Sequence, residues 1–393
     1  MKKQHRLLAL ALCLLLLCTL ALPAGAKKDA PEIKNVIFMI GDGMGENHLL
    51  LAREQGYELF MDTAYDLRGQ SKTRSASDEV TDSAAGATAL SCGVRTKNRF
   101  LATYWFDPSG KVMQPRIITE VAQAHGMKTG IVTTDKTSGA TPAGYSAHVE
   151  DRDMVAEISY SQFESGVDLI WGAKESAADR AAAEENGYTY ITTKDEMEAL
   201  EPGSRSFGQF SSHTWWESLP ADDPSPTLLE MSEKAIDLLN TDNENGFFLM
   251  IEGAHIDKNS HSSSDDGVHY PKKVADTAWA VKGFDNTIKM AVEFARADGH
   301  TLVVVTADHE TGDIYEENGV YTFHSASHSG KNVPIFVYGA DDLFKPGEAV
   351  KNSSIPGRVA QKLGWRRIEF PHVDAGSVTK KVLDFFTFQW MVK

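Results

Sequence analysis

Carboxylate and imidazole side chains recur in this chain at spacings that suit a metal site. Asp257 and His261 are four residues apart in IEGAHIDKNSH, so a helix would place both on one face, where they could bind one ion. One such pair alone is also typical of structural or solvent-facing residues. Further hard ligands, enough in all for two zinc ions and one magnesium ion, occur at Asp42, Glu252, Asp308, His309 and His328.

Ser83 lies in the stretch TDSAAGATAL, where three short polar residues precede small, helix-compatible ones. The start of a helix favours an anion, so a serine there could act as an attacking alkoxide. The alternative is that Thr81, Asp82 and Ser83 only cap a helix. Beside bound zinc the serine would need no histidine base, because zinc lowers the pKa of a coordinated hydroxyl.

Five short apolar runs predict buried strands, and polar residues follow or precede them. Helical patterns at 117–125 and 227–239 lie between them. Alternating strands and helices favour an α/β fold with a large, mostly parallel sheet covered by helices on both faces. Ligands of such sheets bind outside the carboxyl ends of the strands. The expected strands are 35–40, 128–134, 246–251, 301–306 and 333–338.

We expect residues 27–393 to form a single catalytic domain. Segment 166–223 is predicted to break the alternation of strands and helices. It is interpreted as a peripheral β/α unit with a strand at 188–193, followed by an insertion containing Trp215 and Trp216. The C-terminal tail, 366–393, is crowded with apolar side chains, which favours core or dimer packing over membrane contact.

Residues 1–26 have the pattern of a signal peptide: three basic residues, an apolar run over 7–22, and an Ala-Gly-Ala cleavage site. We expect an exported protein that is periplasmic, on the cell surface or extracellular. A retained anchor is the alternative, but the run is short for a full span, so no stable membrane span is expected after cleavage.

Charge and cysteine content exclude some classes of partner. Loss of residues 1–26, which hold three basic and no acidic side chains, changes the net charge from −16 to −19. Nucleic acid and anionic membranes are poor partners for such a surface. Only Cys92 remains after cleavage, so no intrachain disulfide can form.

Taken in order, these motifs resemble the alkaline phosphatase family, over about residues 35–364. The family's nucleophile motif is matched by Asp82-Ser83-Ala84, and its first metal-binding aspartate by Asp42 in IGDGMG. The remaining ligands are matched by Glu252, Asp257 and His261 in IEGAHIDKNSH, by Asp308 and His309 in TADHE, and by His328 in SHSG.

The resemblance implies a role for each matched residue. One zinc would be held by Asp257, His261 and His328, and a second, facing Ser83, by Asp42, Asp308 and His309. Magnesium would be held by Asp42, Thr141 and Glu252. Arg152 in SAHVEDRD matches the arginine that grips two phosphate oxygens. Lys258 matches a position that reaches phosphate through water in some members, and a solvated surface lysine is the alternative.

Gly139 departs from the family pattern. Two residues before Thr141, members usually carry Asp or His beside the magnesium. Because groups around a metal's ligands can change affinity about 10–100-fold, the magnesium site is the least secure part of the resemblance. The family also suggests a homodimer.

The implied reaction is hydrolysis of small phosphate monoesters through a phosphoserine, with an alkaline optimum. A sulfatase would need Pro and Arg after the nucleophile, and Ala84-Ala85-Gly86 has neither. A phosphodiesterase of the same superfamily is an alternative, although Arg152 would crowd a second ester group. A second alternative is a non-catalytic surface protein that binds phosphate or metal.

Overall fold

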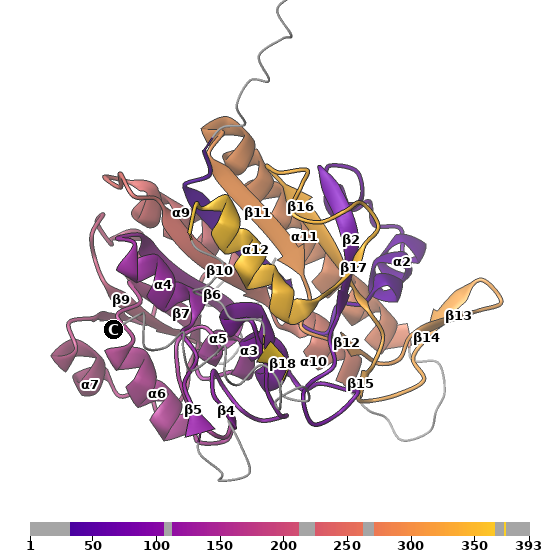
Figure 1. The fold of residues 1–393 in the computed structure, drawn as a ribbon, viewed down its shortest axis with the longest axis horizontal. Helices are drawn as coiled ribbons and strands as arrows, with labels where there is room; N and C mark the ends of the chain where they lie inside the picture. The colour runs from indigo at the N-terminus through magenta and orange to yellow at the C-terminus, as the bar shows by residue number, and fades with distance from the viewer. Residues whose placement is uncertain (1–31, 106–111, 212–224, 262–270, 366–372, 375–393) are drawn as a thin grey trace, which may run out of the picture. The chain divides into compact units, whose positions relative to one another are not determined.

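A ten-stranded sheet is the centre of the computed structural model, which describes residues 32–105, 112–211, 225–261, 271–365 and 373–374 (Figure 1). Among the strands described in this sheet, β16 alone runs opposite to the rest, because it pairs antiparallel with both of its neighbours. The order across the sheet is β17 (Ala349–Lys351), β2 (Leu67–Lys72), β16 (Val333–Tyr338), β11 (Thr301–Thr306), β1 (Asn35–Gly41), β10 (Phe247–Gly253), β6 (Lys128–Lys136), β7 (Leu169–Ala173), β9 (Ser206–Phe210) and β8 (Thr189–Ile191).

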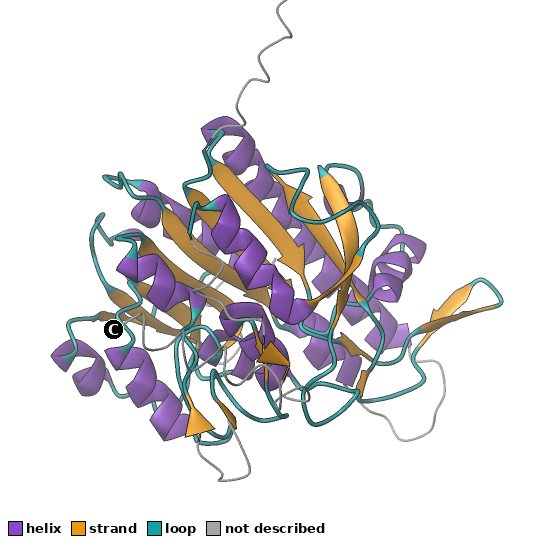
Figure 2. Ribbon diagram, viewed as in Figure 1, coloured by secondary structure: helices purple, strands orange, loops and turns teal. Residues whose placement is uncertain are grey.

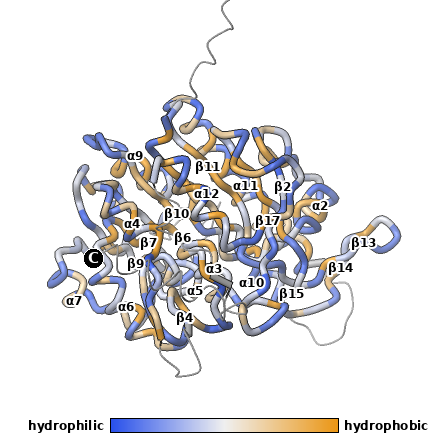
Figure 3. The backbone as a smooth tube through the Cα atoms, viewed as in Figure 1, coloured by the Kyte–Doolittle hydropathy of each residue, from blue (hydrophilic) through white to orange (hydrophobic). Residues whose placement is uncertain are grey.

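The five predicted apolar runs are all strands of this sheet, which confirms the large, mostly parallel α/β architecture. Successive side chains of β1 point to opposite faces, so Ile37 and Met39 pack into one core while Phe38 and Ile40 pack into the other. Figure 3 shows the apolar residues gathered along these central strands. Burial on both faces explains why the strands read as continuous apolar runs in the sequence.

Helices cover both faces of the sheet (Figure 2). Side chains of α2, α9 and α11 pack into one core, and those of α4 and α12 into the core of the opposite face. The predicted helices at 117–125 and 227–239 are α4 and α9, and Thr227 caps α9 as its side chain accepts from the Glu230 N–H. The helices are α2 (Glu46–Glu54), α3 (Ser83–Cys92), α4 (Ile118–Ala124), α5 (Ala140–Ala143), α6 (Val155–Glu164), α7 (Arg180–Glu185), α8 (Lys194–Glu198), α9 (Leu228–Asn240), α10 (His255–His261), α11 (Pro271–Asp298) and α12 (Ile355–Lys362).

The described part of segment 166–223, residues 166–211, adds strands to the central sheet, so within it the expectation of a break in the alternation of strands and helices is wrong, and the expected insertion lies largely outside the described residues. Its order is β7, α7, β8, α8 and β9, and β7, β8 and β9 join the sheet in parallel beyond β6. The strand expected at 188–193 is β8, and it lies at the sheet edge. The strand LIWGA of β7 is short and contains Gly172, which weakened its signal. Trp215 and Trp216 lie outside the described residues.

Short strands complete the fold outside the sheet. They pair as β3 (Val94–Arg95) with β18 (Val373–Asp374), β4 (Tyr104–Trp105) with β5 (Val112–Met113), β12 (Glu310–Thr311) with β15 (His328–Ser329), and β13 (Tyr315–Glu317) with β14 (Val320–Thr322). Two single 3-10 turns are η1 (Phe60–Asp62) and η2 (Asn352–Ser354). In the part of the chain that the structure describes, no helix is long and apolar enough to cross a membrane. The predicted signal peptide, 1–26, and most of the tail 366–393 fall outside that part, and the single catalytic domain stays a prediction.

An ion pair between Glu120 on α4 and His148 should make stability depend on pH. The His148 Nε2 lies 3.0 Å from Glu120 Oε1, and His148 Nδ1 donates to the Ala102 carbonyl oxygen at 2.7 Å. Burial lowers the pKa of His148, but the contact with Glu120 outweighs burial, so the pKa of His148 is raised. Burial likewise raises the pKa of Glu120, but the contact with His148 outweighs it, so the pKa of Glu120 is lowered. The stabilisation is therefore present below pH about 6.5 and is lost as pH rises through the raised pKa of His148.

We expect Glu120→Gln to lower the free energy of unfolding by about 0.5–1 kcal/mol at pH 5.5 and by less at pH 9. The glutamine side chain can still accept the Ile117 N–H that Glu120 accepts at 2.8 Å, so the helix start is preserved. Urea unfolding at the two pH values measures the difference, with Glu157→Gln, an exposed acid on α6, as the control. An equal loss at both pH values would contradict the proposed pairing.

Candidate active site

Four adjacent strands, β11, β1, β10 and β6, end at one edge of the sheet, and chemically active side chains lie there. Asp42 follows the end of β1, and Glu252 lies at the end of β10 in register with the last residues of β1. Asp308 lies two residues beyond β11, which is in register with the other side of β1. Because β16 runs in the opposite direction, the chain enters it from this same edge, and His328 lies in that entry.

Ser83 is the first residue of α3, as predicted. The Asp82 side chain caps this helix by accepting the Ala85 N–H at 3.0 Å. All ten residues of α3 are buried, and nearly all are small, so the helix can lie close to the strand ends. Gly86 marks the closest approach, because a β-carbon there would lie 3.0 Å from the Asp308 Cβ. The Ser83 Oγ lies 3.1 Å from His309 Nε2.

Asp42, Asp308 and His309 form a buried group, and His309 connects it to this hydroxyl. The His309 Nε2 lies 3.1 Å from Asp308 Oδ2 and 3.5 Å from Asp42 Oδ1. Asp308 Oδ1 accepts the backbone N–H groups of Gly43 and His309, which fixes the carboxylate. Neither Asp308 Oδ2 nor Asp42 Oδ1 has a hydrogen-bond partner. Buried carboxylate oxygens without partners are unusual unless they bind an ion.

The electrostatics of this group favour a bound cation. The Thr311 hydroxyl donates to Asp257, so its oxygen accepts from His309 Nδ1–H at 3.2 Å, and neutral His309 then presents a lone pair at Nε2. Burial, and then the charge of Asp308, raises the pKa of Asp42 well above its usual range. Although burial works against it, Asp308 also raises the pKa of His309. A divalent cation would offset the repulsion between the Asp42 and Asp308 carboxylates, which bound protons must otherwise offset. The nitrogen and oxygen donors of this group suit zinc.

Asp257, His261 and His328 form a second group, half-buried, beside the first. Asp257 and His261 lie one turn apart on α10, as their spacing predicted. The Nδ1 atoms of His261 and His328 donate to the carbonyl oxygens of Ala326 at 2.7 Å and Thr81 at 2.9 Å. In the neutral rings this leaves lone pairs on two Nε2 atoms only 3.0 Å apart, an arrangement that a metal ion between them would stabilise.

Thr311 connects the two groups, and no pattern in the sequence marked it. Its hydroxyl contacts both Asp257 and His309 Nδ1, and the rings of His309 and His328 stack with centroids 3.5 Å apart. Burial, and then the positive charge that His309 carries when protonated, lowers the pKa of His328 to about 4, so the His328 imidazole is neutral at neutral and alkaline pH. A neutral imidazole is the form that binds metals.

Thr141 and Glu252 offer further buried oxygen donors, which we call the third donor set. Thr141 Oγ1 and Glu252 Oε1 are buried and have no hydrogen-bond partner. The other carboxylate oxygen of Glu252 accepts from the Thr133 hydroxyl. Burial, and then the charge of Asp135, raises the pKa of Glu252 to about 8. Hydroxyl and carboxylate oxygens around a site that needs positive charge fit magnesium.

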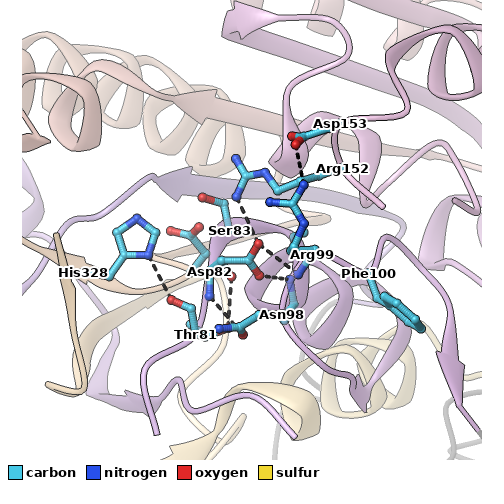
Figure 4. Close-up of polar contacts among 12 residues, drawn as sticks. Thr81, Asp82, Ser83, Asn98, Arg99, Phe100, Arg152, Asp153 and His328 are labelled. Carbon is cyan, nitrogen blue, oxygen red and sulfur yellow. Dashed lines mark hydrogen bonds and ion pairs between the residues drawn. The ribbon is translucent and has the colours of Figure 1, made fainter. Parts of the chain in front are cut away.

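Arg152 lies over the start of α3, beside Ser83 (Figure 4). Its Nη1 is 3.2 Å from Asp82 Oδ2, which also accepts the Arg99 N–H at 3.0 Å. The Arg99 guanidinium in turn pairs with Asp151. Asp82 is thus both the helix cap and an anchor for Arg152, a second role that the sequence did not reveal.

Lys258 pairs with an acidic side chain and is not a free surface lysine. Its Nζ lies 2.7 Å from Asp135 Oδ1, and its side chain is half-exposed. Although burial works against it, Asp135 raises the pKa of Lys258. Asp135 directly follows the predicted strand 128–134, so the rule that polar residues follow strand ends could have identified it.

A mostly parallel α/β sheet with a capped serine and acid–imidazole groups at its carboxyl edge defines a metal-dependent hydrolase. The sequence profile described as alkaline phosphatase matches residues 33–168 and 164–339 of this chain. The chain therefore belongs to the alkaline phosphatase family, and it is a phosphomonoesterase.

Individual relatives agree with this assignment. Alkaline phosphatase 4 of Bacillus subtilis is 34% identical over 338 residues, which cover 80% of this chain and 70% of that protein. Alkaline phosphatase of Escherichia coli is 30% identical over 349 residues, which cover 72% of this chain and 70% of that protein. The structure of the alkaline phosphatase from the Antarctic bacterium TAB5 matches with a TM-score of 0.69 at 29% identity, covering 86% of this chain and 99% of that one.

Proposed function

We propose that this chain hydrolyses phosphate monoesters in two in-line steps through a phosphoserine at Ser83. The observation that carries the proposal is the position of the Ser83 Oγ, 3.1 Å from His309 Nε2 at the start of α3. The same Nε2 atom lies 3.1 Å from Asp308 Oδ2 and 3.5 Å from Asp42 Oδ1, and Arg152 lies beside Ser83 over the helix start. A nucleophile, a metal group and an anion-binding cation therefore meet at one point.

The metal ligands in this proposal are those expected from the sequence. Zinc would be held by Asp257, His261 and His328 and by Asp42, Asp308 and His309, and magnesium by Asp42, Thr141 and Glu252. When bound, the zinc ions would lower the pKa of a coordinated hydroxyl or water and stabilise the charge on the leaving oxygen. A variant of the TAB5 alkaline phosphatase in which a histidine is replaced by aspartate has Mg bound in its M3 site, which supports magnesium here.

The chain's own residues would act in a fixed order. The Ser83 Oγ attacks phosphorus in line with the leaving oxygen, so the bond to Ser83 forms as the bond to the alcohol breaks and that oxygen takes up a proton. Water then attacks phosphorus from the side that the alcohol left, which releases phosphate and restores the hydroxyl. Arg152 and the N-terminal N–H groups of α3 hold the remaining phosphate oxygens throughout.

The substrate class can be tested directly. The purified mature protein, supplied with zinc and magnesium, is assayed on a phosphate monoester, a diester and a sulfate ester. We expect the monoester to be preferred, because a guanidinium that grips two free phosphate oxygens leaves no room for a second ester group. Preference for the diester would remove the role given to Arg152. Absence of turnover on all three esters would instead favour a binding protein.

Replacing Arg152 with alanine is expected to lower kcat/KM for the monoester about 10–100-fold, because a bidentate charge-assisted contact to phosphate is lost. The preference for monoester over diester should narrow at the same time. Steady-state kinetics on both esters measure the effect. Arg180→Ala is a suitable control, since this exposed arginine contacts Glu184 on α7 and the Tyr190 carbonyl oxygen on β8, at the edge of the sheet. An unchanged ratio of the two kcat/KM values would show that Arg152 does not select the substrate.

The cellular setting is proposed from the sequence. Residues 1–26 would direct export to the periplasm, the cell surface or the extracellular space, and the acidic net charge of −16 disfavours nucleic acid as a partner. A homodimer remains a proposal from the family. The partners in solution would be small phosphate monoesters.

A further inference from the structure

Gly139 leaves a space beside the magnesium donors, and another side chain fills it. A β-carbon built on Gly139 would lie 2.8 Å from the Asp135 Cγ and closer still to Oδ2. Any side chain at 139 would therefore have to displace the Asp135 carboxylate. The two positions compete for one volume: Asp135 lies in the last two residues of β6, and Gly139 lies three residues past the end of that strand, two residues before Thr141.

Asp135 is bound on several sides in that space. Its Oδ1 accepts from Lys258 Nζ at 2.7 Å and from the Lys136 N–H at 2.8 Å. Its own backbone N–H donates to the Thr133 hydroxyl at 2.8 Å, and that hydroxyl donates onward to Glu252. The Asp135 side chain is only 21% exposed. Asp135 is thus connected to a buried donor of the third site through one residue and to Lys258 directly.

We propose that Asp135 is a positioning residue for the divalent cation at Asp42, Thr141 and Glu252, with its carboxylate in the place that a side chain at 139 would otherwise take. This inference rests on the proposed function, because it assumes that the third donor set binds magnesium. It assigns a role to a residue that the family motifs do not mark. It also explains how this chain can dispense with a side chain at 139.

The physical effect of Asp135 has two parts. Its negative charge lies close to the site and attracts a divalent ion, and its oxygens can accept hydrogen bonds from water around that ion. It also neutralises Lys258 and holds the ammonium group in one place, so that this cation does not repel the metal. Removing the carboxylate charge while keeping its shape should therefore weaken magnesium binding through both effects.

The test is a magnesium titration of thermal unfolding, carried out on the full mature protein with zinc held saturating. We expect Asp135→Asn to need about 10–100-fold more magnesium than wild type for half of the rise in Tm. The double variant Asp135→Gly with Gly139→Asp, which moves the carboxylate to the other position, should recover most of the wild-type affinity. Magnesium content after gel filtration, measured by elemental analysis, gives a second readout.

Glu230→Gln is the matched control. Glu230 accepts from Lys194 Nζ at 2.6 Å in another lysine–carboxylate pair of similar exposure, in a different part of the fold. Its titration should match wild type, because loss of such an ion pair by itself does not change metal affinity. If Asp135→Asn is unfolded at every magnesium concentration, the double variant still tests the proposal. Failure of the carboxylate at position 139 to restore magnesium binding would reject it.

Two further results would overturn the inference. One is a wild-type magnesium response in Asp135→Asn, and the other is a wild-type protein whose Tm does not respond to magnesium. Either can occur while monoester hydrolysis still depends on Ser83, and in that case only the role of Asp135 fails. A wild-type protein that shows no Ser83-dependent hydrolysis would reject the proposed function instead.

Discussion

Replacing Ser83 with alanine is expected to lower kcat for a phosphate monoester by at least about 10³-fold, because removal of a nucleophile leaves only the slower attack of water within the remaining site. Thermal unfolding and metal content should stay close to wild type, since alanine suits the first turn of α3 and the Asp82 cap does not involve the serine hydroxyl. Single-turnover kinetics and trapping of the phosphorylated protein at low pH measure the loss of the intermediate.

Ser91→Ala is the control for this experiment. Ser91 lies on the same buried helix and donates to the Gly144 carbonyl oxygen at 2.6 Å. Its loss should reduce the free energy of unfolding by about 1–2 kcal/mol while kcat per folded molecule stays near wild type. If Ser83→Ala and wild type released phosphate at equal rates, the assignment of the nucleophile would be wrong.

Removal of bound metal is expected to abolish monoester hydrolysis and to lower Tm. Without a cation, the unpartnered oxygens of Asp42 and Asp308 face the His309 Nε2 in a buried space. An ion present at about 1,000 times its Kd would contribute about 4 kcal/mol to the free energy of unfolding. Dialysis against a chelator, followed by stepwise return of zinc and magnesium, measures activity and Tm together.

The variant Ser83→Ala separates the two effects of metal. It should show the same drop in Tm on chelation as wild type, although it has little activity to lose. Full activity in a preparation whose metal content has fallen far below one ion per chain would contradict the metal-dependent mechanism. A Tm that is unaffected by chelation would show that the two groups do not bind ions in the folded protein.

The sheet and much of the candidate site could be predicted because both depend on local patterns. Central strands are buried on both faces, so the middle residues of runs such as 301–306 are all apolar, and the rule for parallel sheets places Asp42 and Asp308 at one edge. Helical spacing alone placed Asp257 and His261 on one face of a helix, while their role as metal ligands came from the family resemblance. His328 could be placed only loosely, because the reversed direction of β16 depends on pairing with distant strands.

What could not be predicted depends on contacts between segments far apart in the chain. Thr311 touches Asp257 only because β12 and α10 are brought together, and nothing in its neighbourhood distinguishes it from other threonines. The position of Asp135 depends on the missing side chain of Gly139, which the sequence shows only as a departure from a pattern. The strand β7 was missed because a short strand that contains glycine has little periodicity of its own.

Asp82 makes two neighbouring functions inseparable for anyone who redesigns this enzyme. One carboxylate caps α3, accepts the Arg99 N–H and holds Arg152. A substitution there would shift Ser83 and release Arg152 together, so we expect that the effects of changes at 82 and 152 will not add. Libraries that vary these positions one at a time would discard combinations that work only as pairs, and new substrate preferences should be sought by randomising both at once.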